Sequence, residues 1–226
     1  MGAGIAQVAS CAGFPVVMID IEQKYIDRGI QTIEKSLSKL VSKQRMTQEE
    51  ADVAISLVST SISREAAADA DLVIEAIPEV PELKFSAFKE LDSICKESAI
   101  LASNTSSISI NDIADSTNRP ERVIGMHFMN PVPIMKLVEI INGSETDPEV
   151  TSAILTASEK MGKTPLQCND SPGFISNRIL CPMLNEAILA FQEGVAEPEA
   201  IDGIMKLGMN HPIGPLALAD LIGLDT

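Results

Sequence analysis

Two apolar runs constrain the fold of this chain more than any other feature of its sequence. Asp71-Leu-Val-Ile-Glu-Ala-Ile77 is followed by a helical pattern through Leu91, and Ala99-Ile-Leu-Ala102 breaks into the polar segment Ser103-Asn-Thr-Ser-Ser107. A strand that is apolar on both faces is typical of a parallel sheet covered by helices on both sides. The sequence therefore predicts an α/β fold with a mostly parallel sheet.

Further strands follow, and then the strand pattern stops. Three more segments read as strands, the first two joined by the rigid turn Asn130-Pro-Val-Pro133: Val123 to His127, Met135 to Ile141, and Thr164 to Cys168. Beyond them the pattern is helical, with three helices opened by Ser171-Pro172, Glu197-Pro198 and Gly214-Pro215 and the first running roughly from Gly173 to Gln192. We therefore predict a sheet domain over residues 1–168 and a truncated all-α domain over residues 169–226.

The start of the chain holds glycines, a helix, a strand and an acid in that order. Gly2 and Gly4 open a helical pattern, Phe14-Pro-Val-Val-Met-Ile19 reads as a strand, and Asp20 closes it. In a Rossmann dinucleotide-binding motif, glycines let the backbone approach the pyrophosphate at a helix N-terminus, and the acid binds the ribose hydroxyls. Only the tail of that motif is present, so Gly2-x-Gly4 alone also fits a plain N-terminal loop. No arginine follows Asp20 within four residues, which favours NAD over NADP.

His127, one of two histidines in the chain, ends one strand of the predicted hairpin. Glu139 lies in the other strand between apolar neighbours, where an unpaired carboxylate costs free energy. A histidine that donates one ring N–H to this carboxylate keeps its other ring nitrogen available as a base. The alternative is that Glu139 points outward from an alternating strand and His127 is a satisfied core residue. These residues alone leave both interpretations open.

Polar residues follow the carboxyl ends of several predicted strands. Glu79, Asn104, Ser106 and His127 all occupy such positions. Ligands of open α/β sheets bind just outside the carboxyl ends of the strands, so this coincidence favours a functional His127. Ser109-x-x-Asp112 is instead typical of a helix capping box, and we interpret Ser109 as structural.

Residues 23–58 predict a helical hairpin inserted into the sheet domain, with isoleucines and leucines at core-facing spacing. On its first arm Lys35, Lys39 and Lys43 recur every fourth residue, which stacks like charges on one face of the helix. Each such pair destabilises the helix slightly, and an anionic ligand would offset that cost. The alternative is a solvated lysine face balanced by Glu34 and by polar neighbours.

Composition narrows the class of protein. The chain of 226 residues has a net charge of −15, which argues against nucleic-acid binding because phosphate backbones attract basic surfaces. No stretch approaches the roughly 20 apolar residues of a membrane span and no signal peptide is visible, so we expect no membrane partner. Cys11, Cys95, Cys168 and Cys181 have neither metal-ligand nor redox spacing, and a reducing cytoplasm fits them best.

Six motifs along the chain occur together in one known family. They are Met1-Gly-Ala-Gly-Ile-Ala-Gln7, Asp71-Leu-Val-Ile-Glu-Ala76, Ala102-Ser-Asn-Thr-Ser-Ser107, Gly125 to Glu139, Ser171-Pro-Gly-Phe-Ile-Ser-Asn-Arg178 and Gly214-Pro-Leu216. With them the chain resembles the 3-hydroxyacyl-CoA dehydrogenases, and its length pattern is closest to the bacterial 3-hydroxybutyryl-CoA dehydrogenases. The resemblance implies NAD-dependent, metal-free interconversion of a (3S)-3-hydroxyacyl-CoA and its 3-ketoacyl-CoA by a homodimer that pairs through its helical domain.

The resemblance also implies roles for individual residues. His127 would be the general base and Glu139 its orienting partner, while Ser106 and Asn177 would contact the substrate. The set implied to contact NAD is Gly2, Asp20, Glu79, Lys84, Ser106 and Asn130. The set implied to contact the CoA substrate is Ser36, Lys43 and Ser106. The resemblance thus implies a binding function for the helix face that carries the three lysines.

The chain departs from the family pattern at its ends. The family has a strand and two glycines before the position of Met1, and a further helical segment after the position of Thr226. We therefore expect an interior fragment of a longer protein. Two other interpretations are a catalytically inactive relative and a dehydrogenase of the same fold that acts on a 3-hydroxy acid without CoA. The first is disfavoured by the intact set Ser106, His127, Glu139 and Asn177.

Overall fold

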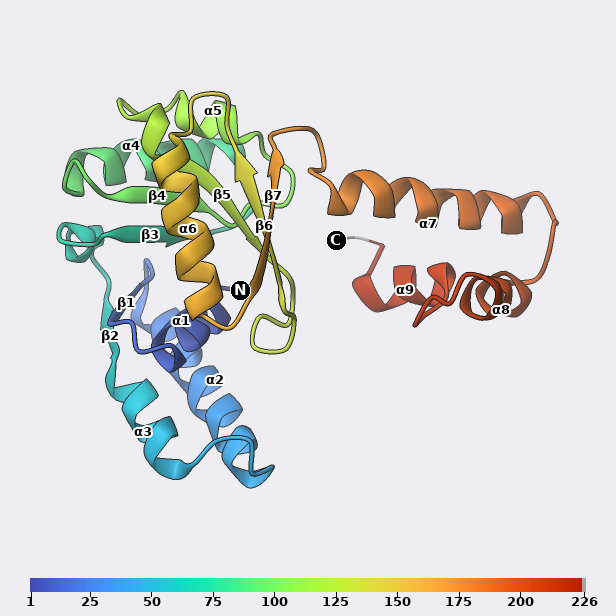
Figure 1. Cartoon of the computed structure of the whole chain (residues 1–226), viewed down its shortest axis with the longest axis horizontal. Helices are drawn as coiled ribbons and strands as arrows, with labels where there is room; N and C mark the ends of the chain where they lie inside the picture. The colour runs from blue at the N-terminus through green and yellow to red at the C-terminus, as the bar shows by residue number, and fades with distance from the viewer. Residues whose placement is uncertain (225–226) are drawn as a thin grey trace. The chain divides into compact units, whose positions relative to one another are not determined.

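The computed structural model describes residues 1–224 and divides into two compact units (Figure 1). The first unit comprises Met1–Pro172 and the second begins at Gly173. The first holds every strand in the part of the chain that the structure describes, and the second is helical. An α/β unit followed by an α-helical unit is the architecture that the sequence predicts.

The strands of the first unit form two sheets. In the smaller sheet, β1 (Val16–Ile19) pairs in parallel with β2 (Val58–Ser61). The larger sheet has the order β3-β4-β5-β6-β7, with bounds Leu72–Glu75, Ile100–Ser103, Val123–Phe128, Leu137–Asn142 and Thr164–Asn169. All of its pairs are parallel except β5 with β6, which is antiparallel. The mostly parallel sheet predicted from the apolar runs is thus confirmed.

Helices cover these sheets and form the predicted hairpin. Their bounds are α1 Gly2–Cys11, α2 Gln23–Ser42, α3 Gln48–Ser56, α4 Pro81–Ile94, α5 Ile110–Ala114 and α6 Pro148–Lys160, with short 3₁₀ turns at Arg64–Ala67 and Pro120–Arg122. The hairpin of α2 and α3 is confirmed, but its helical pattern ends earlier than predicted. Val58 begins strand β2, which the sequence analysis missed because Val58 is its one apolar residue, followed by Ser59-Thr-Ser61.

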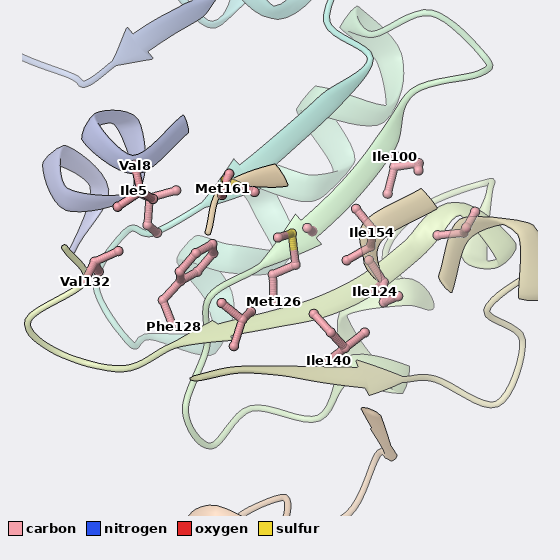
Figure 2. Packing of buried hydrophobic residues seen from close by; sticks show 13 residues of the cluster. Ile5, Val8, Ile100, Ile124, Met126, Phe128, Val132, Ile140, Ile154 and Met161 are labelled. Carbon is pink, nitrogen blue, oxygen red and sulfur yellow. The ribbon is translucent and has the colours of Figure 1, made fainter. Parts of the chain in front are cut away.

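The main core lies between the larger sheet and helices α1 and α6. Ile124, Met126 and Ile140 have no exposed surface, and they pack with Ile154 of α6 (Figure 2). Strand β5 is buried along its whole length, which is the expected environment of an apolar strand covered on both faces. His127 therefore lies in a rigid, water-poor part of the unit.

The second unit contains α7 (Ser176–Gln192), α8 (Pro198–Gly208) and α9 (Pro215–Ile222). Prolines open α8 and α9 as predicted. Helix α7 begins later than the predicted Gly173, because Gly173 and Phe174 have φ angles of 75° and 51°, which a right-handed helix cannot contain. In the part of the chain that the structure describes, no helix combines the length and apolar character needed to cross a membrane.

Candidate active site

Strand pairing brings His127 and Glu139 together. In the antiparallel β5–β6 ladder the two residues are direct register partners. His127 is 6% exposed and Glu139 is 4% exposed, and 3.0 Å separates His127 Nδ1 from Glu139 Oε2. The predicted pairing is confirmed, and the alternative of an outward-facing Glu139 is wrong. A buried carboxylate next to the ring makes Nδ1 the protonated nitrogen, so Nε2 carries the lone pair.

Ser106 meets the opposite side of the imidazole. Its Oγ lies 3.0 Å from His127 Nε2. Ser106 is half-buried on the turn after β4, whereas the ring behind it is enclosed, so this edge of the imidazole is the one that a substrate can reach. A hydroxyl group placed here is within reach of both Ser106 Oγ and the basic nitrogen.

Glu79 holds the Ser106 turn. Its Oε1 accepts hydrogen bonds from Ser106 N at 2.9 Å, from Ser107 N and Oγ at 3.0 Å, and from Thr105 Oγ1. Partial burial alone would raise the pKa of the Glu79 carboxyl, but these hydrogen bonds and the nearby Lys84 charge outweigh burial and lower the pKa. Glu79 therefore stays ionised at neutral pH and fixes the backbone of the turn.

The buried ion pair of Lys84 and Glu75 lies next to Glu79. Lys84 is 1% exposed, and its Nζ lies 2.7 Å from Glu75 Oε1 and 3.3 Å from Glu79 Oε2. Ser103 Oγ donates to the second oxygen of Glu75 at 2.7 Å. Glu75 is a functional candidate that the sequence analysis missed. Its signal was visible, since it is an acid inside the apolar run that defines β3.

Asn104 ties the Ser106 turn to the strand that carries His127. Its Oδ1 accepts a hydrogen bond from Phe128 N at 2.9 Å. Asn104 follows β4, and Phe128 ends β5, so this bond fixes the ends of two neighbouring strands relative to each other. This hydrogen bond and those from Ser106 N and Ser107 N to Glu79 limit the separation of Ser106 and His127.

The start of the chain fits a dinucleotide. Helix α1 begins at Gly2, where an added Cβ would lie 3.9 Å from Ala76 Cβ, so the helix N-terminus faces the end of β3. Asp20 directly follows β1 and accepts a hydrogen bond from Ile21 N at 2.7 Å. A helix N-terminus for phosphate and an acid at a strand end for ribose are the groups that NAD requires.

The other predicted site residues belong to other elements of the chain. Asn130 is exposed on the loop after β5, Ser36 is half-buried on α2, and Lys43 is exposed at the C-terminus of that helix. Asn177 lies in the first turn of α7, in the second unit. Within the described residues, the first unit thus brings together Ser106, His127 and Glu139, with Glu79 and Lys84 behind them.

A helix N-terminus and a strand-end acid that fit a dinucleotide, together with a buried histidine–carboxylate pair, are features expected of an NAD-dependent dehydrogenase. Comparison with known families agrees. Residues 1–171 match the NAD-binding domain of 3-hydroxyacyl-CoA dehydrogenase, and residues 173–226 match its C-terminal domain. The chain belongs to the 3-hydroxyacyl-CoA dehydrogenase family.

Individual relatives are similar over the whole chain. A protein of Deinococcus radiodurans named "Probable 3-hydroxybutyryl-CoA dehydrogenase" is 57% identical over 100% of this chain and 81% of its own length. The 3-hydroxybutyryl-CoA dehydrogenase of Clostridioides difficile is 48% identical over 100% of this chain and 80% of its own. The crystal structure of (S)-3-hydroxybutyryl-CoA dehydrogenase from Ralstonia eutropha superposes with a TM-score of 0.98, at 49% identity, over 100% of this chain and 80% of that one.

Proposed function

We propose that this protein interconverts (3S)-3-hydroxybutyryl-CoA and acetoacetyl-CoA with NAD as the hydride carrier. The observation that carries this proposal is the line of contacts from Ser106 through His127 to Glu139, buried except at its Ser106 end. It offers one basic nitrogen, one hydroxyl and one counter-charge close to where strands β4 and β5 end. The names of the similar proteins supply the substrate class.

His127 moves the proton in this proposal. In the oxidation direction, Nε2 takes the proton of the substrate 3-hydroxyl, while Ser106 Oγ hydrogen-bonds the same oxygen. Bound NAD supplies the acceptor for the hydride that leaves C3. The imidazolium that forms lies against the Glu139 carboxylate, which stabilises it and holds the ring orientation. General-base catalysis of this kind is typically worth about 10²–10⁴-fold in rate.

The binding roles are also part of the proposal. Gly2 at the start of α1 would face the pyrophosphate and Asp20 the ribose, with Glu79 and Asn130 as further NAD contacts. Lys84 would serve the cofactor through Glu79, because its ammonium group is buried against Glu75 and Glu79. The residues proposed to contact the acyl-CoA substrate are Ser36, Lys43 and Asn177.

A serine, a histidine and an acid in line also occur in serine hydrolases. Such an enzyme needs N–H groups near the serine that can bind an oxyanion. Here the N–H groups of Ser106 and Ser107 both donate to Glu79 Oε1, and a carboxylate at that position repels a second anion. This arrangement favours proton transfer by His127 over nucleophilic attack by Ser106.

We propose further that the protein acts in the cytoplasm as a homodimer. Cys11, Cys95 and Cys181 are free thiols, which suits a reducing compartment. The helical unit exposes large apolar residues, among them Ile179, Leu207 and Met209, which suits association with a second copy. The net charge of −15 does not favour nucleic acid as a partner.

Acetoacetyl-CoA-dependent oxidation of NADH tests the proposed function. The purified protein is mixed with NADH and acetoacetyl-CoA, and the loss of NADH absorbance is followed. We expect turnover that needs the CoA ester, that stops when free acetoacetate replaces it, and that falls sharply with NADPH. Equal rates with free acetoacetate would contradict CoA recognition, and no turnover by a folded protein that binds NADH would contradict the proposed reaction.

A further inference from the structure

Lys163 is a buried lysine outside the cluster around His127. It follows Gly162, whose φ of 71° ends α6, and its own N–H donates to Ser158 O at 3.0 Å. This turn directs the side chain inward, and Lys163 is 8% exposed although it directly precedes β7. A lysine loses favourable hydration on burial, so such a position requires partners for its ammonium group.

Those partners are two backbone carbonyls of one loop. Lys163 Nζ donates to Met135 O at 2.8 Å and to Val132 O. The same loop is closed by Ile134 N and Met135 N, which both donate to Pro131 O at 3.0 Å. Burial lowers the pKa of Lys163, and no carboxylate forms an ion pair with it among residues 1–224. The lysine therefore serves as a hydrogen-bond donor to this loop.

The loop is held from its other side by helix α1. Val132 is 3% exposed and packs in the main core with Ile5 and Val8 of that helix (Figure 2). A Cβ added to Gly4 would lie 3.0 Å from Val132 Cβ, so helix and loop are already in close contact. Lys163 and α1 thus hold the loop between them.

We propose that Lys163 is a positioning residue for the NAD half of the reaction. The loop of residues 129–136 joins the strand of His127 to the strand of Glu139 and carries Asn130, and it packs on the helix that begins at Gly2. By fixing two carbonyls of this loop, Lys163 sets where the cofactor lies relative to the His127 ring. The kinetic consequence of this inference rests on the proposed function. The effect of Lys163 on the loop rests on the geometry alone.

The kinetic test compares three variants. Lys163→Met keeps the length of the side chain but removes the donors, Lys163→Arg keeps donors, and Lys160→Met is the control at an exposed lysine on α6. We expect Lys163→Met to raise KM for NADH at least about five-fold while KM for acetoacetyl-CoA stays within about two-fold. Lys163→Arg should lie closer to the wild type, and Lys160→Met should equal it. Equal rises in both KM values, or no rise, would overturn the proposal.

Hydrogen exchange tests the same inference without turnover. In the protein without ligands, the amides of Ile134 and Met135 should exchange about ten-fold faster in Lys163→Met than in the wild type. Their exchange rates should be unchanged in Lys160→Met. An inactive wild type with this exchange pattern would refute the proposed function and keep the role of Lys163 in the loop. Unchanged exchange would overturn that role. If Lys163→Met does not fold, Lys163→Gln, whose shorter side chain cannot span both carbonyls, takes its place in both tests with the same outcomes.

Discussion

The cluster of Ser106, His127 and Glu139 and the lysine face of α2 use polar groups in opposite ways. In the cluster, Ser106 follows strand β4, His127 lies in β5 and Glu139 lies in β6. His127 and Glu139 are buried, and each has a fixed hydrogen-bond partner. The lysine face, Lys35, Lys39 and Lys43, comes from one helix, and all three side chains are exposed. The first is assembled in the protein without a substrate, whereas the second is a solvated surface that a ligand would have to order.

This difference sets the size and kind of effect that each region can have. A charge in a water-poor site interacts strongly with its neighbours, because little solvent screens it. An exposed charge is screened by water and salt, and its pair interactions are worth about 1 kcal/mol or less. Substitutions in the cluster should therefore change kcat by orders of magnitude, and substitutions on the lysine face should change KM by small factors.

The largest effect should follow from His127→Gln. The substitution removes the proton acceptor and leaves the cofactor-binding residues in place, so we expect kcat to fall at least about 10²-fold with little change in NADH affinity. Steady-state kinetics and an NADH fluorescence titration measure the two quantities. Turnover near that of the wild type would show that another group takes the proton.

Glu139→Gln should come next. Glutamine can still accept a hydrogen bond from His127 Nδ1, but it is neutral and cannot stabilise the imidazolium. We expect kcat to fall about 10²-fold while the circular dichroism spectrum and melting temperature stay close to those of the wild type. If the variant instead fails to fold, Glu139 is a structural acid, and the comparison between the two regions loses its chemical basis.

The pairing of His127 with Glu139 could be predicted because side chains alternate along a strand. A short hairpin with a rigid turn limits the possible registers, and an acid among apolar residues needs a partner. The mostly parallel sheet could be predicted for a similar reason, since uninterrupted apolar runs are local features of the sequence. Both inferences use spacing within about 15 residues of chain.

The supports of the cluster could not be predicted in the same way. Glu79 meets the Ser106 turn across 27 residues, and Lys163 reaches Val132 across 31 residues. No periodic pattern records such contacts, because they depend on how separate strands and loops pack. The pairing of strand β2 with β1, which joins Val16 to Val58, is a contact of the same kind. Sequence alone thus indicated the proposed reacting groups better than the residues that hold them in place.

Glu79→Ala tests whether those supports matter for chemistry. Without the carboxylate, the N–H groups of Ser106 and Ser107 lose their acceptor and the turn loosens its hold on the Ser106 hydroxyl. We expect kcat at saturating NADH to fall about ten-fold, in keeping with the loss of hydrogen bonds to a charged group. Glu82→Ala, at an exposed acid of α4, is the matched control and should leave kcat unchanged. An unchanged kcat in Glu79→Ala would mean that the turn is rigid without it.

The lysine face should give the smallest effect, and one of a different kind. Lys43→Glu removes an attraction for the phosphates of CoA and adds a repulsion, but water and salt screen both because Lys43 is exposed. We expect KM for acetoacetyl-CoA to rise several-fold and this rise to shrink as salt is added, while kcat and KM for NADH stay nearly constant. Lys89→Glu, an equal change of charge at an exposed site on α4, separates a local contact from the general effect of a more acidic protein. If Lys89→Glu raised KM for the CoA ester as much as Lys43→Glu, the lysine face would be a solvated surface without a ligand. A fall in kcat as large as that of Glu79→Ala would instead mean that this helix reaches the reacting groups, and the contrast between the two regions would be wrong.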